Sequence, residues 1–140
     1  MVYEIPEALT ISANIAFEQD FSLTQVSLRT CIANLEEGRP TTPQALSRLT
    51  TELDRARHNR IGLLKIIHGY GSTGEGGVIR HAVQAELVRL EREGQIRAFI
   101  SGEDWRISNE PTWDLLSKHR ELKRDRDLGR GNRGISIVVL

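Results

Sequence analysis

Lys65-Ile-Ile-His-Gly-Tyr-Gly-Ser-Thr-Gly-Glu-Gly-Gly-Val-Ile-Arg80 is the stretch that decides the fold. An apolar run ends in His68, five glycines fall within residues 69–77, and an amphipathic pattern begins just after them. This order predicts a buried strand, a loop of bare backbone and a helix N-terminus. Such a loop can bring backbone N–H groups close to a phosphate, and the helix dipole favours an anion there. The alternative is a strand-to-helix connection that needs its glycines only for positive φ angles.

Helical signals lie on both sides of this stretch. Thr41 and Gln44 are spaced as in a capping box, with Pro43 in the first turn, so a helix is predicted over about residues 42–58. A second helix is predicted from the end of the glycine loop to Gly94. Both carry apolar residues at helical spacing, which are Leu46, Leu49, Leu53 and Ala56 in the first and Ile79, Val83, Leu87 and Leu90 in the second.

Four β-rich segments complete the pattern, at about residues 30–36, 61–67, 95–100 and 134–140. The resulting order is β-α-β-α-β-insert-β, which predicts an α/β fold in which helices pack on a sheet as a compact two-layer sandwich. Crossover helices imply a mixed, mostly parallel sheet. The last strand follows another strand without a full helix between them, which leaves it free to pair antiparallel. Residues 101–130 form the insert, and its charged second half is expected to be mobile.

The length of 140 residues predicts one domain over residues 31–140, preceded by an N-terminal arm or extra strands over residues 1–30. Nineteen basic residues balance nineteen acidic ones, but residues 118–133 carry seven basic and three acidic groups. The single cysteine, Cys31, excludes an internal disulfide, fits a cytoplasmic location and is expected to be a small core residue. The sequence shows neither an 18-residue apolar run nor a leader pattern, so no membrane partner is expected.

The segments Leu64–Gly71 and Val78–Val83 together resemble the central signature of the small MutS-related (Smr) domain. The glycine-then-strand segment Gly131–Leu140 and the helix start at Thr42–Leu46 are similar to other parts of that domain. The resemblance covers roughly residues 31–140 and implies the same compact α/β sandwich. It also implies binding of DNA or RNA, since members of this family are nucleic-acid binders. Several members are endonucleases, some in recombination control and others on messenger RNA at stalled ribosomes.

One segment departs from the family pattern. The first strand of the family ends in aspartate-leucine-histidine-glycine, whose aspartate and histidine are implicated in cleavage, whereas the matching place here reads Asn34-Leu35-Glu36-Glu37. Asn34 cannot take a proton as an aspartate can. Glu36 can act as a base, but an ordinary pKa of about 4.3 makes it a poorer proton shuttle at neutral pH than a histidine. The candidate catalytic residues are therefore His68 and Glu36, and enzyme activity is left open.

The loop region supplies the candidate nucleic-acid contacts. Tyr70 could stack on an unpaired base or merely cover the loop, and an exposed Arg80 could bind a phosphate in bidentate fashion. The full candidate set is His68, Gly69, Tyr70, Gly71, Ser72, Gly74, Gly76, Gly77 and Arg80. Each has a structural alternative, which for His68 is a hydrogen bond to its own loop.

Outside the loop, the basic insert residues are interpreted either as solubilising charges or as contacts along a nucleic-acid backbone; they are Lys118, Arg120, Lys123, Arg124 and Arg126. Trp105 and Trp113 are expected to anchor the insert to the body. The four histidines lack ligand spacing, so no metal site and no cofactor is predicted, although a divalent metal is compatible with the endonuclease hypothesis.

The leading hypothesis is thus an Smr-like domain that contacts the phosphate backbone through the glycine-rich loop after His68. The first alternative is an Smr-type endonuclease that nicks DNA or cleaves RNA. The second is a protein-interaction module in which the glycine loop has a structural role.

Overall fold

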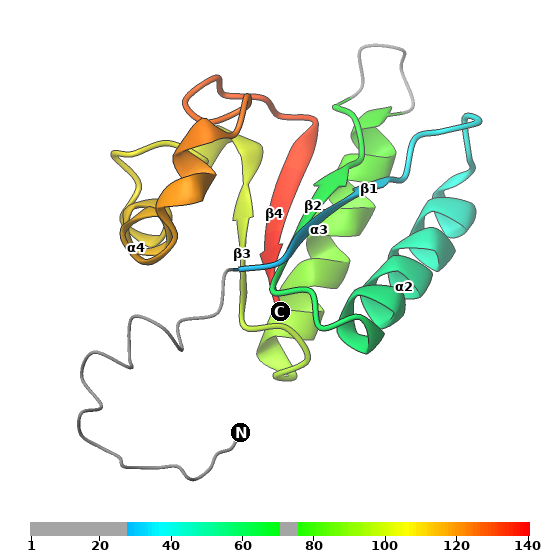
Figure 1. Ribbon diagram of the computed structural model, residues 1–140. Coiled ribbons are helices and arrows are strands. Elements are labelled where there is room, and N and C mark those ends of the chain that lie inside the picture. Colours follow the sequence, from blue (N-terminus) through cyan, green and yellow to red (C-terminus); the bar gives the residue numbers. More distant parts are fainter. Residues whose placement is uncertain (1–27, 71–75) are drawn as a thin grey trace, which may run out of the picture.

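Four strands form one sheet in the order β1-β2-β4-β3 (Figure 1). The computed structural model describes residues 28–70 and 76–140. The strands are β1 (Thr30–Asn34), β2 (Leu63–Ile67), β3 (Ala98–Ser101) and β4 (Ile135–Val139). β1 pairs parallel with β2, whereas β4 lies antiparallel between β2 and β3. The predicted α/β fold with a mixed sheet is confirmed. Three strands share one direction, but the final strand inserts between two of them, so only one of the three pairings is parallel.

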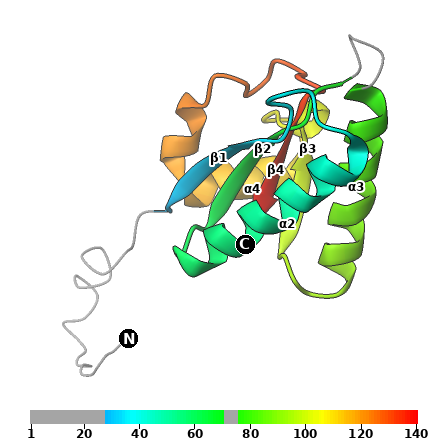
Figure 2. The same cartoon turned by 90° about the vertical axis from the view of Figure 1, so that its right-hand side faces the viewer.

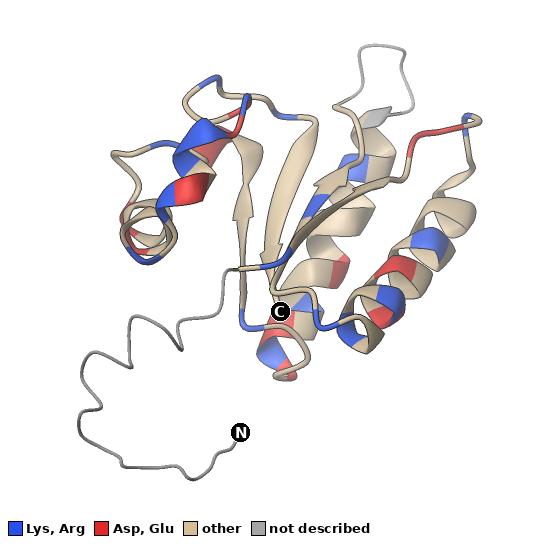
Figure 3. Cartoon of the chain, viewed as in Figure 1, with Lys and Arg blue, Asp and Glu red and all other residues tan. Residues whose placement is uncertain are grey.

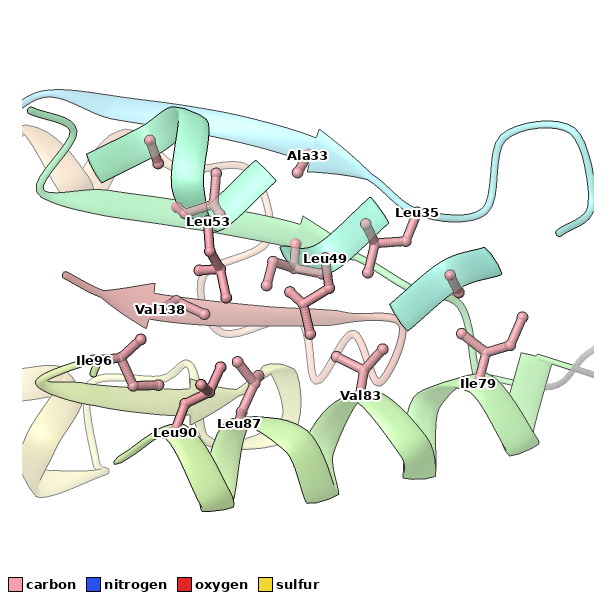
Figure 4. Packing of buried hydrophobic residues seen from close by; sticks show 14 residues of the cluster. Ala33, Leu35, Leu49, Leu53, Ile79, Val83, Leu87, Leu90, Ile96 and Val138 are labelled. Carbon is pink, nitrogen blue, oxygen red and sulfur yellow. The ribbon is translucent and has the colours of Figure 1, made fainter. Parts of the chain in front are cut away.

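Helices α2 (Thr42–His58) and α3 (Gly76–Arg92) cover one face of this sheet (Figure 2). The capping box predicted at the start of α2 is present. The Thr41 side chain accepts from the Gln44 N–H at 3.3 Å, and the Gln44 side chain accepts from the Thr41 N–H at 2.9 Å. The apolar stripes of the two helices interdigitate over the sheet in one buried cluster (Figure 4), which includes Leu49, Leu53, Val83, Leu87 and Val138.

The insert covers the other face of the sheet with η2 (Gly102–Asp104), α4 (Glu110–Lys118) and η3 (Arg120–Arg124). Trp105, 1% exposed, packs there with Leu116, Leu122 and Ile137 in a second buried cluster. The expectation of a mobile insert is therefore wrong, because its few apolar residues find a second sheet face to cover. Trp105 anchors the insert as predicted, but Trp113 does not, since it is 50% exposed.

Two further expectations have clear outcomes at the N-terminal side. Cys31 is exposed rather than a core residue; it lies on the edge strand β1, in which only Ala33 is buried. The predicted arm or extra strands fall almost wholly on residues 1–27, outside the described residues. Within the described ranges, no helix is both long and apolar enough to span a bilayer.

Candidate nucleic-acid interface

Several of the candidate site residues predicted from the sequence lie at one end of the sheet. β1 and β2 both end there, β4 begins there, and α3 starts close by after the glycine loop (Figure 1). We call this end the carboxyl edge, after the carboxyl ends of β1 and β2. In sheets with parallel strands, the connections at this end are the usual place for a ligand. The topology therefore brings His68, which directly follows β2, to the same edge as Asn34 at the end of β1.

His68 is completely buried, with 0% exposure. Its Nδ1 lies 2.7 Å from the Gly69 carbonyl oxygen, and its Nε2 lies 2.9 Å from Ser136 Oγ. Because a carbonyl can only accept, Nδ1 carries the proton, and Nε2 of the neutral ring accepts from the Ser136 hydroxyl. Burial is the main cause that lowers the pKa of His68 from its ordinary 6.5; the Gly69 hydrogen bond opposes it and the Arg80 charge adds to it. His68 is thus a neutral group that fixes its own loop to β4.

Gly69 turns the chain at the end of β2 with a φ of +77°, a conformation that favours glycine. Its N–H donates to the Gly134 carbonyl oxygen at 3.1 Å, and the same oxygen accepts from the His68 N–H at 2.9 Å. The Gly69 N–H was predicted to face a phosphate, and that part of the hypothesis is wrong because the β4 connection already occupies the donor.

The Glu36 carboxylate lies against Gly69. A Cβ atom placed on Gly69 would be 2.6 Å from Glu36 Oε1, so only a glycine allows this approach. The Glu36 N–H donates to Asn34 Oδ1 at 2.9 Å, which closes a tight turn after β1. Asn34 therefore orients the turn, while Glu36 keeps an exposed carboxylate at the carboxyl edge. The candidate catalytic pair lies at the same edge, but as an exposed carboxylate and a buried, neutral imidazole.

Arg80 is only 8% exposed, so the prediction of an exposed phosphate ligand is wrong. Its Nε donates to the Arg133 carbonyl oxygen at 3.1 Å, and its terminal nitrogen donates to both carboxylate oxygens of Glu103 at 3.0 and 2.9 Å. Arg80 follows Ile79 on the sheet-facing side of α3, where η2 and the segment before β4 cover it. Arg80 thus clamps those two segments together beneath the surface.

A buried ion-pair network fixes the second half of the insert. Lys65, 7% exposed on the insert face of β2, lies 2.9 Å from Asp125 Oδ1 and also contacts the Asp127 carboxylate. The Trp105 indole N–H donates to Asp125 at 2.9 Å, and the Asn132 amide donates to Asp127 at 3.0 Å. Every carboxylate in this network has several charged or polar donors, as a buried charge requires. The network holds residues 125–132 against the sheet.

The two aspartates of this network account for the charge of the insert surface. Residues 118–133 contain three acidic groups, and two of them face inward to Lys65. Burial alone would raise the pKa of Asp127, but hydrogen bonds from Lys65 and Asn132, together with the Lys65 charge, outweigh burial and lower it. Lys65 therefore offsets one of these two negative charges, and the segment between η3 and β4 carries three arginines and two aspartates (Figure 3).

Beside this segment lies an open concavity of about 630 Å³. It borders Tyr70, which follows the Gly69 turn and is 53% exposed. Its lining residues are Tyr70, Arg126, Asp127, Arg130, Gly131, Asn132 and Arg133. The concavity joins the first residues of the glycine loop to the basic insert, two features that the sequence separates by more than fifty residues. Three guanidinium groups around one aromatic ring suit a polyanion with planar groups.

The remaining predicted residues divide into two groups. Gly71, Ser72 and Gly74 lie outside the described residues, so their predicted phosphate contacts stay predictions. Gly76 and Gly77 open α3, as the sequence predicted, which places a helix N-terminus near the carboxyl edge. Across the described ranges, no group of three histidine, cysteine or acidic side chains is arranged to hold a metal ion.

Sequence reasoning missed three features of the edge. Ser136 as the partner of His68 and Lys65 as the centre of the network could not be seen, because both contacts join distant strands and loops. Arg133 was missed as a lining residue, although Arg130-Gly-Asn-Arg133 stands directly before a strand. That signal, a short basic turn that leads into β4, could have indicated a second loop at the carboxyl edge.

Comparison with known proteins finds one matching family model. Residues 39–106 match the model of the Smr domain. A solved structure, the Smr domain of Thermus thermophilus MutS2, aligns with a TM-score of 0.47 and 20% identity over 80% of this chain and 96% of that one. No curated protein matches this chain closely enough to be reported as a relative.

The matched range begins after the Asn34-Leu35-Glu36 segment and ends at Arg106, at the start of the insert. It contains α2, β2, α3 and β3, together with the glycine loop and η2 of the insert, and it includes most residues of the buried cluster beneath the two helices. The stretch from which the fold was predicted, Lys65–Arg80, lies wholly inside the matched range. Over residues 39–106, the chain is therefore similar to the Smr domain family.

Proposed function

We propose that this Smr-like domain binds nucleic acid at the carboxyl edge, with the phosphate backbone against the basic segment between η3 and β4. The observation that carries the proposal is the concavity lined by Arg126, Arg130, Arg133 and Tyr70, next to the glycine loop after His68. Guanidinium groups bind phosphate oxygens in bidentate fashion and are the preferred side chains for this contact. The N-terminus of α3 at the same edge adds a favourable field for an anion.

The charge distribution supports the same conclusion. The net charge of the chain is zero, so binding cannot depend on a global field. Residues 125–133 carry three arginines against two aspartates, and Lys65 offsets one of the two carboxylate charges, so a local cationic surface remains. Arg126 and Arg130 are exposed and make no ion pair within residues 28–70 and 76–140. Their charges are therefore available to a phosphate without breaking an internal contact.

Binding without cleavage is the form of this function that the geometry favours. The endonuclease alternative needs His68 to exchange a proton with substrate, but both of its ring nitrogens are hydrogen-bonded inside the protein. The alternative of a protein-interaction module predicts no affinity for nucleic acid at all. The two alternatives are therefore separated from the proposal by a cleavage assay and a binding assay.

The binding test compares the parent with Arg126→Gln/Arg130→Gln, using fluorescence anisotropy with labelled oligonucleotides of mixed sequence over a range of salt concentrations. Each phosphate contact contributes a slope of roughly −0.7 to −0.9 to the dependence of log K on log salt. The double variant should bind more weakly for all sequences, and its slope should be less steep by about 1.5. Its thermal midpoint should be unchanged, because both side chains are exposed.

The matched control is Arg92→Gln. Arg92 is an exposed arginine in the last turn of α3, at the end of the helix away from the glycine loop. At about 1.5 Å per residue, the 17 residues of α3 put it roughly 25 Å from the helix start. Equal losses in the control and in the double variant would contradict a site at the carboxyl edge. A parent chain that binds neither DNA nor RNA would favour the interaction module.

A further inference from the structure

We propose that the concavity beside Tyr70 holds one unpaired nucleotide, so that this domain prefers single-stranded nucleic acid to duplex. The base would stack on the Tyr70 ring, and the adjoining phosphates would bind the arginines of the concavity. This inference rests on the proposed function and specifies the class of nucleic acid. It follows from how the ring is supported, which polar groups around it are free, and how much space lies beside it.

The Tyr70 ring is held in place and yet open. The chain turns at Gly69, which is buried, and then presents Tyr70 with about half of its surface exposed. A Cβ atom on Gly134 would lie 3.2 Å from Tyr70 Cδ1, closer than ordinary contact. One side of the ring thus lies against the bare backbone at Gly134, and a side chain there would crowd it. A supported aromatic surface of this kind is a stacking platform.

The polar groups around the ring divide into fixed and free ones. Asn132 is fixed, because its Oδ1 accepts from the Gly134 N–H at 2.8 Å and its amide donates to Asp127 at 3.0 Å. Asp127 is in turn bound by Lys65. What remains to meet a ligand is the guanidinium groups of Arg126 and Arg130, while Arg133 Nε lies 4.0 Å from Glu103 Oε2. Guanidinium groups recognise phosphate, so the site should bind bases of any identity by stacking and should not read their edges.

The size of the concavity and the cost of extruding a paired base both favour a single strand over a duplex. A volume of about 630 Å³ falls within the range of roughly 300–1,000 Å³ typical of small-molecule sites, enough for one nucleotide. A base inside a duplex is stacked on both sides and paired, and its extrusion costs a few kcal/mol. An unpaired base avoids most of that cost. Tyr70 should therefore contribute to the binding of single strands and contribute little to the binding of duplex.

The test measures anisotropy with a 12-nucleotide single strand, the same strand as a duplex, and a 12-unit abasic strand that keeps the phosphates but lacks bases. The parent should bind the single strand at least about tenfold more tightly than the duplex. Tyr70→Leu keeps apolar volume but removes the ring. Its affinity for the single strand should be about tenfold lower than that of the parent, and its affinity for the duplex and the abasic strand should be almost unchanged. Tyr70→Phe should retain the parent affinity, because the ring and not the hydroxyl stacks.

The outcomes separate this inference from the proposed function. A parent that binds no ligand defeats the proposed function itself. A parent that binds all three ligands, with Tyr70→Leu equal to the parent or weakened equally on all three, overturns the stacking site and leaves backbone binding intact. The variant Arg126→Gln/Arg130→Gln should bind all three ligands more weakly, and by a similar factor, because each of them carries phosphates.

Discussion

Lys65 Nζ lies 2.9 Å from Asp125 Oδ1, although 60 residues of sequence separate the two. Lys65 belongs to the central strand β2, and Asp125 follows η3 in the charged insert. This one contact ties the region that would bind nucleic acid to the core of the sheet. The positive charge of Lys65 also offsets negative charge that would otherwise repel a polyanion.

The first prediction concerns this ion pair. Lys65→Met should destabilise the fold by about 3 kcal/mol, because it leaves the largely buried carboxylates of Asp125 and Asp127 without their cation. Urea denaturation measures the change. The control is Arg55→Gln, which removes a surface pair with Glu52 and should cost about 0.5 kcal/mol or less. Equal stability of Lys65→Met and the parent would show that the network contributes nothing.

The second prediction concerns pH. His68 is neutral in the fold, and burial lowers its pKa below 6.5, so the unfolded chain takes up a proton first as the pH falls. The stability that depends on the neutral ring is therefore complete above about pH 6.5 and decreases as the pH falls below it. Unfolding free energies measured from about pH 7.5 to about pH 5.5 should decline in the parent and decline less in His68→Gln. Identical slopes in the two proteins would contradict the buried neutral ring.

The third prediction concerns Arg80. Because this side chain is buried and binds Arg133 and Glu103, Arg80→Gln should lower the unfolding free energy by about 1–2 kcal/mol. Arg89→Gln on the same helix is the matched control, since the ion pairs of Arg89 among the described residues are with the half-buried Glu86 and the exposed Glu93 of its own helix. It should change stability far less. If Arg80→Gln keeps the parental thermal midpoint but weakens nucleic-acid binding, Arg80 is a direct ligand after all.

The fourth prediction concerns cleavage. The purified chain should neither nick supercoiled plasmid nor cut structured RNA at an appreciable rate, with or without divalent metal. The reason is that Nδ1 and Nε2 of His68 already bind Gly69 and Ser136, so that Glu36 is the exposed member of the candidate catalytic pair. Glu36→Gln and His68→Ala serve as controls. Robust nicking that disappears in both variants would establish the endonuclease alternative, with an expected loss of about 10²–10⁴-fold.

Local chemistry was readable from the sequence by itself. The capping box at Thr41 and the spacing of Leu49 and Leu53 predicted α2 within its observed bounds, because capping and helical periodicity depend on residues a few positions apart. The apolar run before His68, followed by glycines, predicted β2 and the start of α3 for the same reason. These local signals also carried the resemblance to the Smr family.

The tertiary structure alone decided which polar side chains are buried and which are free. Arg80 and Lys65 belong to residue types that usually lie at the surface, yet each is buried against carboxylates that come from a distant segment. Tyr70 and Arg130 lie sixty residues apart and line one concavity. Such contacts depend on how β4 inserts between β2 and β3, because that topology brings the segment after η3 back to the end of β2. The sequence determined the elements and the resemblance to the Smr domain family, whereas the non-local packing of charged side chains determined the surface that would meet a nucleic acid.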